Sequence, residues 1–225
     1  MNVLGVDVGG TFTDAVLLAD GELRTAKVPT SSRQEEAVVA AAAEVAAREV
    51  DRFTHGTTVA TNALLERKGA RTAFVATAGF EHLLHLRRQD RAHLYRLCAA
   101  HPEPLVPLER CVGVRERTGP DGVLEPLDLG SLPELDPLVE AVAVCLLFSF
   151  RDPAHERAVA EELRRRLPGA RVVASHEVSP EFREYERAST AATDAYLGLV
   201  VSRYLEALGE AAADAALPEP LVMRS

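Results

Sequence analysis

The segment GVDVGGTFTD, residues 5–14, holds the densest group of side chains and backbone groups that could bind a phosphate. The pair Gly9-Gly10 lets a turn adopt positive φ and approach a ligand closely, and successive amides there can form an anion-binding nest. Polar side chains stand on both sides of the glycines: Asp7, Thr11, Thr13 and Asp14. An ordinary hairpin of small residues is the alternative, but it would not need these polar neighbours. The segment therefore predicts a phosphate-binding hairpin.

A second hydroxyl-rich segment, THGTTVATNALLERKGA, occupies residues 54–70. Here a strand end runs through Gly56 into the start of a helix, where unpaired amides and the positive end of the helix favour an anion. The alternative is structural, because Thr57 and Thr58 could be helix caps and His55 a hydrogen-bonded core histidine. Spacing alone does not decide between these two interpretations.

The first segment needs a β-hairpin to position it, and the N-terminal pattern predicts one. Three strands with two tight turns are expected over 2–8, 13–19 and 22–28, and Asp20-Gly21 is the stronger turn signal. A helix to about Val50 follows, with Ser32 and Glu35 at the spacing of a capping box. The next expected elements are a strand over 52–56, a helix from about Thr58 to Lys68 that ends at Gly69, and a strand over 71–77.

Residues 82–137 lose this regular pattern, which is typical of a small inserted module. They contain an arginine-rich stretch, a proline-rich stretch and a hairpin that turns at residues 119–122. The apolar segment over 142–150 then has the composition of a central strand covered on both faces. A helix over 153–167, a strand over 171–175 and a long helix from about 184 to 209 follow. Strand–helix alternation after an initial meander predicts an α/β fold with a mixed sheet.

Composition and charge exclude several classes of protein. The 225 residues are 47% hydrophobic and 26% charged, as in an ordinary globular protein. The net charge of −9 argues against a nucleic-acid partner, and the apolar run at 141–150 is too short to cross a membrane. The N-terminus lacks the basic region of a signal peptide, so we expect a cytoplasmic protein.

Cysteines and histidines do not point to a metal or redox site. The three cysteines, at positions 98, 111 and 145, fit neither a zinc pattern nor a disulfide framework, and we expect them to be reduced and structural. His155-Glu156 is not followed by the second histidine of a zinc-binding HExxH motif. Neither the dinucleotide fingerprint GxGxxG nor the Walker loop occurs.

Four further stretches extend the pattern of the first two segments: GFEHLLHLRRQDR, VRERTGPDG, AVCLLFSFRDPAHE and EYERASTAATDAY. Together these segments resemble, in register and over essentially all 225 residues, the N-terminal region of the hydantoinase A/5-oxoprolinase family. Relatives in that family include ATP-dependent acetone and acetophenone carboxylases. The resemblance implies the first lobe of the actin/hexokinase ATPase superfold, with a ribonuclease-H-like mixed sheet and a small inserted module.

The resemblance also implies a division of the chain. Residues 1–81 would form the first part of the ribonuclease-H-like lobe, 82–137 an inserted loop and hairpin module, 138–220 the rest of the lobe with the long helix, and 221–225 the start of a second domain. Family members continue into that second domain with their own Gly-Gly-Thr phosphate segment, so a fragment or excised domain is expected here. Asp194 stands where much of the family has Asn, either a surface substitution or a change at a ligand contact.

The activity that the resemblance implies is ATP-dependent opening of a cyclic amide or imide. Phosphorylation of the lactam or imide oxygen would give ring opening by water a good leaving group. Catalysis would then depend on alignment and charge stabilisation by Mg²⁺, amides and hydroxyls. We expect ATP and Mg²⁺ as cofactors, a small cyclic amide or imide as substrate, and negligible activity from this chain alone.

The resemblance assigns roles to residues of this chain. Those expected at the β- and γ-phosphates are Gly9, Gly10, Thr11 and Thr13. Those expected to be catalytic are Asp7, which would hold Mg²⁺ through water, and Asp14, His55, Thr57 and Thr58, which would face the cleft near the γ-phosphate. Weaker candidates for substrate contacts are Asn62, Arg88, Gln89 and Arg91. The arginines could bind a substrate carboxylate, or could simply belong to a solvated helix face.

Three other functions share part of this pattern. A subunit of an ATP-dependent ketone carboxylase would have the same motifs, and a non-catalytic nucleotide-binding module would keep the fold without the chemistry. A sugar or acetate kinase would share the hairpin but not the segment at 54–70. The chain could form a homo-oligomer, or a hetero-oligomer with a second hydantoinase subunit.

Overall fold

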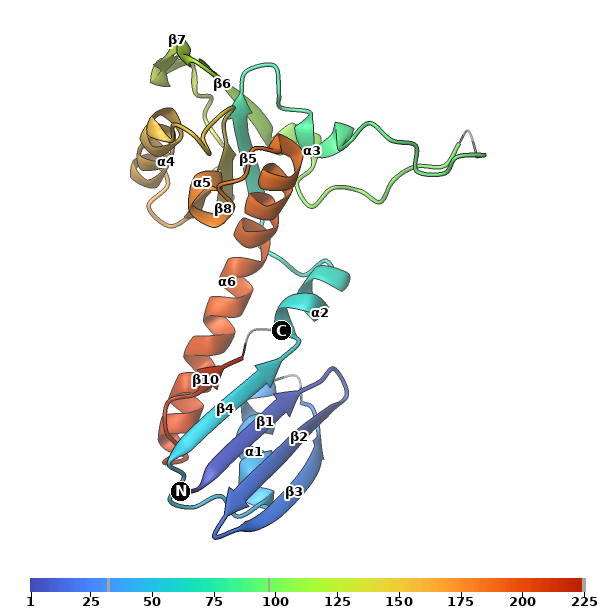
Figure 1. Cartoon of the computed structure of the whole chain (residues 1–225), viewed down its shortest axis with the longest axis vertical. Helices are drawn as coiled ribbons and strands as arrows, with labels where there is room; N and C mark the ends of the chain where they lie inside the picture. Colours follow the sequence, from blue (N-terminus) through green and yellow to red (C-terminus); the bar gives the residue numbers. More distant parts are fainter. Residues whose placement is uncertain (32, 97, 224–225) are drawn as a thin grey trace. The chain divides into compact units, whose positions relative to one another are not determined.

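A computed structural model describes residues 1–31, 33–96 and 98–223 of the chain. Within these residues the strands and helices form two units, one from residues 1–68 together with those from Val200 onward, the other from residues 69–199. The described part of each unit contains a mixed sheet of five strands (Figure 1). The predicted α/β class is confirmed, with two mixed sheets where the sequence indicated one.

The sheet of the first unit grows from the N-terminal meander. Its strands are β1 (Val3–Val8), β2 (Phe12–Ala19), β3 (Glu22–Pro29), β4 (Arg52–Thr57) and β10 (Leu221–Val222). Its helices are α1 (Gln34–Glu44), α2 (Val59–Leu65) and, from Val200 onward, the second half of α6 (Glu184–Asp214). β1 pairs antiparallel with β2 and parallel with β4, and β3 and β10 lie at the two edges. The predicted meander and both of its turns are confirmed.

The two faces of this sheet differ because side chains alternate along each strand. Leu4 and Val6 of β1 point into a core that α1 and the second half of α6 close. Asp7 and Asp14 point to the opposite face, where apolar side chains stay in contact with solvent. Three of these are Val16, Leu18 and Leu23, which are 41%, 45% and 66% exposed.

Helix α1 ends six residues before the predicted end at Val50. The backbone of Ala46 adopts φ 52°, and the amide of Ala47 donates to the carbonyl of Ala42 over 3.0 Å, which together close a Schellman motif. The usual sequence signal for this motif is glycine, which is missing here. At the other end, the helix starts after Arg33, which makes no side-chain cap; the predicted capping residue Ser32 lies outside the described residues.

Helix α2 also ends without glycine, so the predicted stop at Gly69 was wrong. Arg67 takes the left-handed position with φ 54°, and the amide of Lys68 donates to the carbonyl of Ala63 over 2.8 Å. Gly69 lies two residues later, in the second unit, where a Cβ atom would overlap the ring of Tyr196. Its small size therefore serves packing rather than helix termination.

The second unit holds a sheet in the order β7-β6-β5-β8-β9. Its strands are β5 (Thr72–Thr77), β6 (Cys111–Gly119), β7 (Gly122–Asp128), β8 (Ala141–Cys145) and β9 (Arg171–Ala174). Its helices are α3 (Leu83–Leu86), α4 (Ala154–Arg166), α5 (Ser175–Val178) and the first half of α6, with 3₁₀ turns η1 (Leu108–Arg110) and η2 (Leu129–Ser131). β6, β5, β8 and β9 run parallel, and β7 pairs antiparallel with β6.

The central strands β5 and β8 are buried on both faces. Helix α4 covers one face, where Val159 and Leu163 pack against Val142 and Val144. Helix α3 and the first half of α6 cover the other, where Ala188 belongs to the same cluster as residues of β5 and β8. The predicted hairpin that turns at residues 119–122 is confirmed, as are the helix near 153–167 and the strand near 171–175.

Two elements of the second unit differ in length from the prediction. β8 ends at Cys145 because the following residues turn, with Phe148 at φ 56°, and α6 continues to Asp214 instead of ending near 209. The predicted boundaries at 81–82 and 137–138 both fall inside this unit, where β6 pairs directly with β5. The division of the chain implied by the family resemblance stays a prediction.

The cysteines are free thiols, and two of them are inert by burial. Burial raises the pKa of Cys111 to about 12 and that of Cys145 to about 11, whereas Cys98 is exposed. Among residues 1–31, 33–96 and 98–223, no helix combines the length and the apolar character needed to cross a bilayer. The same residues contain no group of three or more acidic, histidine or cysteine side chains placed to hold a metal ion.

Candidate functional site

The turn between β1 and β2 is fixed through its carbonyl groups. The amide of Gly9 donates to the carbonyl of Phe12 over 3.0 Å, and Thr30 binds the other side of the turn. The Thr30 hydroxyl donates to the carbonyl of Gly9 over 3.0 Å, and its amide to the carbonyl of Thr11 over 2.9 Å. Within the described residues, the amides of Gly10 and Thr11 donate no hydrogen bond. The turn therefore offers two successive donors on a rigid support.

The segment at 54–70 meets this turn because β4 runs parallel to β1, so the carboxyl ends of both strands lie at one edge. The Thr58 hydroxyl donates to the carbonyl of Val8 over 3.2 Å. The Asn62 amide group donates to the Thr58 hydroxyl over 3.2 Å and lies 3.7 Å from where a Cβ of Gly10 would stand. These contacts place Thr58 and Asn62 next to the glycine turn. Helix α2, which carries Asn62, has seven residues.

Asp7 lies on the open face of the sheet, with glycine on the neighbouring strand. Its partner across β1 and β4 is Gly56, and a Cβ added there would lie 2.7 Å from Oδ1 of Asp7. Its partner on β2 is Asp14, whose carboxylate accepts from Lys27 at 2.7 and 2.8 Å. A hollow of about 290 Å³ covers this area, with a lining that includes Gly5, Asp7, Asp14, Val16, Thr54 and Met223.

Among the described residues, one member of this carboxylate pair, Asp14, has an ion pair and the other, Asp7, does not. Like charges directly opposite on neighbouring strands repel, and Lys27 offsets that repulsion at Asp14. Asp7 forms no ion pair among the residues that the structure describes. Its negative charge is therefore available to a cation at the edge that carries the glycine turn.

His55 does not face this hollow. The side chain is fully buried on the covered face of the sheet, where Nε2 lies 2.7 Å from the hydroxyl of Tyr204 on α6. Burial lowers the pKa of His55 and raises that of Tyr204 to about 12, so both are neutral at pH 7. The structure thus agrees with the alternative interpretation of His55, a hydrogen-bonded histidine in the core.

Thr13 and Thr57 also have structural partners. The Thr13 side chain is fully buried, and its hydroxyl lies 3.0 Å from that of Thr30, which holds the turn. The Thr57 hydroxyl accepts from the amide of Val59 over 3.2 Å at the start of α2. Thr13 therefore supports the glycine turn and Thr57 the start of α2, both from the covered face of the sheet.

Three of the four weaker candidates for substrate contacts lie in the second unit, whereas Asn62 lies on α2 in the first. Arg88 forms an ion pair with Glu186, Gln89 has a positive φ of 58°, and Arg91 is exposed. Asp194 accepts from Arg171 over 3.1 Å on the half-exposed side of α6, so its negative charge is compensated there.

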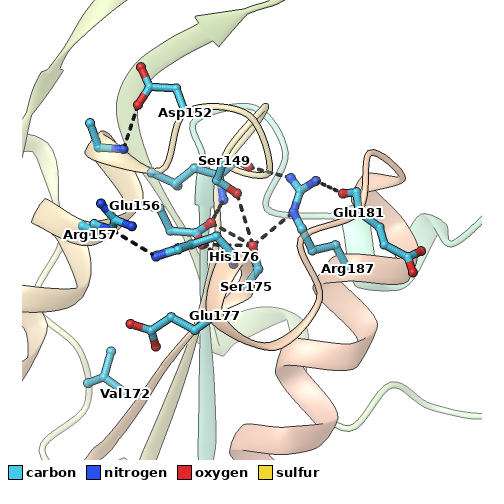
Figure 2. A network of polar contacts seen from close by, with 12 residues as sticks. Ser149, Asp152, Glu156, Arg157, Val172, Ser175, His176, Glu177, Glu181 and Arg187 are labelled. Carbon is cyan, nitrogen blue, oxygen red and sulfur yellow. Dashed lines mark hydrogen bonds and ion pairs between the residues drawn. The ribbon is translucent and has the colours of Figure 1, made fainter.

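A buried polar network in the second unit was not anticipated from the sequence (Figure 2). Glu156 accepts hydrogen bonds from the amide of Leu146 over 2.7 Å, from Nδ1 of His176 over 2.7 Å and from the Ser175 hydroxyl over 2.9 Å. Burial alone would raise the pKa of Glu156, but the bonds from His176 and the amides outweigh it and the pKa is lowered. Arg187 joins through Nε to Ser175 and through Nη2 to the carbonyl of Leu146.

A second network is centred on Thr77, the last residue of β5. Its hydroxyl donates to the buried Glu116 and accepts from the amide of Leu147 over 3.0 Å. Glu116 also accepts from Nδ1 of His155 over 2.8 Å. The adjacent pair His155-Glu156 at the start of α4 therefore serves both networks. The sequence held one signal of these networks, the adjacent polar residues His155 and Glu156. Neighbouring residues at the start of a helix point in different directions, so the two side chains can join different networks.

Comparison with known proteins adds the following. Residues 3–167 match the model of the hydantoinase/oxoprolinase N-terminal region. The chain is 35% identical to the caprolactamase subunit alpha of Pseudomonas jessenii, in an alignment that covers 90% of this chain. It is 36% identical to the acetophenone carboxylase gamma subunit of Aromatoleum aromaticum, in an alignment that covers 88% of this chain. The crystal structure of the ATP-dependent caprolactamase from Pseudomonas jessenii superposes with a TM-score of 0.84 at 30% identity over 98% of this chain. The chain spans about a third of each of these proteins, 32%, 31% and 35%.

Proposed function

The chain belongs to the hydantoinase/oxoprolinase family, and from that premise we propose that its first unit is the phosphate-binding lobe of an ATP-dependent enzyme that opens a cyclic amide or imide. The observation that carries the proposal is the turn at Gly9-Gly10, where the amides of Gly10 and Thr11 have no partner among the described residues. Asp7 lies on β1, the strand that leads into this turn. The activity belongs to a protein about three times as long as this chain, as in the relatives, with this chain as its ATP-binding region.

The topology of the first sheet supports assignment to the actin-like ATPase superfold. Three antiparallel strands, β1 to β3, are followed in space by β4 and β10, both running parallel to β1. This strand order and these directions support the ribonuclease-H-like arrangement that the family resemblance implies. In such a sheet a ligand binds beyond the carboxyl ends of the parallel strands, the edge at which the Gly9-Gly10 turn lies.

The residues at this edge fit a polyphosphate. The amides of Gly10 and Thr11 would donate to the terminal phosphate oxygens, with the Thr11 hydroxyl beside them. Asn62 would add a side-chain amide, since its carboxamide already lies over Gly10. Donors fixed in advance need no reorganisation when charge develops on the phosphoryl group. ATP would supply the phosphoryl group that makes the substrate oxygen a leaving group.

Asp7 fits the role of holding Mg²⁺ through water. A single carboxylate with room for water is the usual protein contribution to this ion. The absence of a side chain at Gly56 leaves that room, because a Cβ there would touch the Asp7 carboxylate. Asp14 would remain on the same face with its charge offset by Lys27, near the γ-phosphate and the substrate.

The remaining predicted residues take supporting roles in this proposal. Thr13, Thr57 and His55 would hold the turn and the end of β4 in place from the covered face. Thr58 would fix the start of α2 to the end of β1. Substrate contacts from Arg88, Gln89 and Arg91 stay a prediction.

The test is substrate-dependent release of phosphate by the full-length protein with Asp7→Asn. We expect a fall of at least about 100-fold, the scale seen when one electrostatic contact to a reacting centre is lost. Asp20→Asn is the matched control, because Asp20 occupies the other turn of the same meander with φ 53°, which Asn tolerates. Activity of D7N equal to that of D20N would refute the proposal.

A ketone carboxylase subunit is the second candidate, favoured by the 36% identity to the acetophenone carboxylase gamma subunit. Both functions would use the same phosphate site, so the site alone does not separate them. Phosphate release by the full-length protein should be compared with a set of cyclic amides and with ketones plus bicarbonate. The names of the relatives as subunits also support a hetero-oligomer for the full-length protein.

A further inference from the structure

The second unit has its own edge at which a parallel sheet could bind a ligand. From β5 the chain crosses to β6 on the face covered by α3, and from β8 it crosses to β9 on the face covered by α4. The connections therefore leave β5 and β8 in opposite directions. In open α/β sheets such a switch point, at the carboxyl ends of the two strands, is the usual place for a ligand.

Three segments contact Thr77 at the carboxyl end of β5. The amide of Phe80, in the loop after β5, donates to the carbonyl of Thr77 over 2.9 Å. The amide of Leu147, in the loop after β8, donates to the Thr77 hydroxyl, and the same hydroxyl contacts Glu116 of β6. β6 pairs with β5 only as far as Val114 and then continues past the end of β5. Residues 115–119 therefore extend beyond the carboxyl end of β5.

The side chain next to Glu116 is a cation, Arg117, whose contact among the described residues is with an aromatic ring. Arg117 is half-buried, and its guanidinium lies 5.3 Å from the centre of the Phe80 ring. Within the described residues Arg117 makes no hydrogen bond or ion pair, whereas its neighbour Arg115 binds Asp128 over 2.6 Å. A guanidinium stacked on a ring keeps its in-plane donors free, in the fork geometry that matches a carboxylate.

The loop after β8 adds apolar surface in a fixed and unusual backbone. Phe148 adopts φ 56°, which is rare for an aromatic residue and is found where the surroundings impose it. The network in Figure 2 is what imposes it, since Arg187 holds the carbonyl of Leu146 and Ser149 lies 3.3 Å from Ser175. Phe148 and Phe150 are half-buried, with their ring centres 5.7 Å apart.

We propose that the carboxyl edge of the second sheet, between β5 and β8, binds a small organic carboxylate, with Arg117 as the anion contact and Phe80 and Phe148 beside its apolar part. Among the described residues, this end of the sheet combines a cation that has no ion pair, aromatic side chains and a rigid support, and the proposed phosphate site uses none of them. An oxyanion without an apolar part would leave the aromatic side chains unused, which favours a carboxylate over inorganic phosphate.

The test uses ¹⁹F NMR of the chain with 4-fluorobenzoate as the probe and 4-fluorobenzyl alcohol as its uncharged match. We expect saturable binding of the carboxylate with a Kd on the order of 1 mM, as for a fragment of this size, and none of the alcohol. Arg117→Gln should weaken binding at least ten-fold. Arg117→Lys, which keeps the charge but loses the fork, should weaken it less.

Two control arginines make the assignment falsifiable. Arg115→Gln removes an exposed arginine of the same strand and should leave binding unchanged. Arg151→Gln removes an arginine from a hollow of about 300 Å³ beside the β6–β7 turn, which is an alternative place for an anion. Binding lost in R151Q and kept in R117Q would overturn the proposal, and so would a wild-type chain that does not bind or that binds both probes alike. Circular dichroism of each variant would show that it is folded.

Discussion

The buried network around Glu156 in the second unit and the open turn at Gly9-Gly10 in the first unit differ in how their polar groups are satisfied. In the second unit Glu156 and Arg187 are fully buried, and a continuous network satisfies both. In the first unit the amides of Gly10 and Thr11 and the carboxylate of Asp7 lack partners among the described residues. Buried groups must be satisfied or the fold loses stability, whereas exposed groups are satisfied by water and stay available to ligands. Changes to the buried network should therefore appear as lost stability, and changes to the turn as lost binding.

The largest effect is expected from Glu156→Ala. The substitution leaves His176, Ser175 and the amide of Leu146 without their acceptor and the buried guanidinium of Arg187 without a carboxylate in its network. Breaking such a buried charged network costs about 3–5 kcal/mol. Hydrogen exchange measured by mass spectrometry should accelerate by about 100-fold or more in β8 and β9.

The control for this prediction is Glu161→Ala, which removes an exposed carboxylate from the same helix, α4. Its exchange in β8 and β9 should match that of the original chain. Exchange in β1 and β4, in the first unit, should be the same in both variants. Slow exchange in β8 and β9 of E156A would show that the network does not stabilise the second unit.

The units should also respond to acid at different pH. Burial lowers the pKa of His55, so its neutral form stabilises the first unit above the ordinary value of 6.5, and this contribution is lost as the pH falls below it. The pKa of Glu156 is lowered too, so its ionised form stabilises the second unit above 4.5, and this contribution is lost only at lower pH. Exchange corrected for its intrinsic pH dependence should accelerate in β4 before β8. The reverse order would contradict both assignments.

A smaller effect is expected from Tyr204→Phe in the first unit. The hydroxyl contacts Nε2 of His55 over 2.7 Å in the core, and its loss leaves that nitrogen buried without a partner. The cost of an unsatisfied buried group is about 1–3 kcal/mol. Urea unfolding followed by circular dichroism would measure it, with Tyr196→Phe as control, since no hydrogen bond of the Tyr196 hydroxyl is seen among the described residues. Equal midpoints for Y204F and Y196F would remove the pair from the stabilising contacts of the unit.

Local signals predicted much of the fold. Period-two alternation with turns at Gly9-Gly10 and Asp20-Gly21 gave the meander, and uniform apolar runs gave β5 and β8. The ends of α1 and α2 were missed because Ala46 and Arg67 take left-handed positions that usually hold glycine. The separation into two sheets was missed as well, because it depends on pairing between strands far apart in the chain.

Residue types and their spacing indicated which residues belong to the candidate site, but they did not indicate the direction in which each side chain points. Gly9, Gly10 and Asp7 were singled out because a glycine pair flanked by polar residues at a strand end is typical of a phosphate-binding turn, and their role stays a proposal. His55 and Gly56 are neighbours in the sequence, yet strand alternation sends the His55 side chain into the core and leaves Gly56 on the open face. The networks around Glu156 and Glu116 left little trace, because their members come from separate segments.

The smallest effect is expected from Ala46→Gly at the end of α1. Ala46 has φ 52°, so glycine relieves the steric cost of its Cβ and should raise the free energy of unfolding by about 0.5–1 kcal/mol. Ala43→Gly, inside the same helix, should lower it by a similar amount, and urea unfolding would give opposite signs for the two. Phe148→Gly in the second unit relieves a similar φ of 56°, but it also removes the ring that lies against Phe150. A gain in A46G with a loss in F148G would show that strain in the first unit is local, whereas in the second the packing around the strained residue outweighs it.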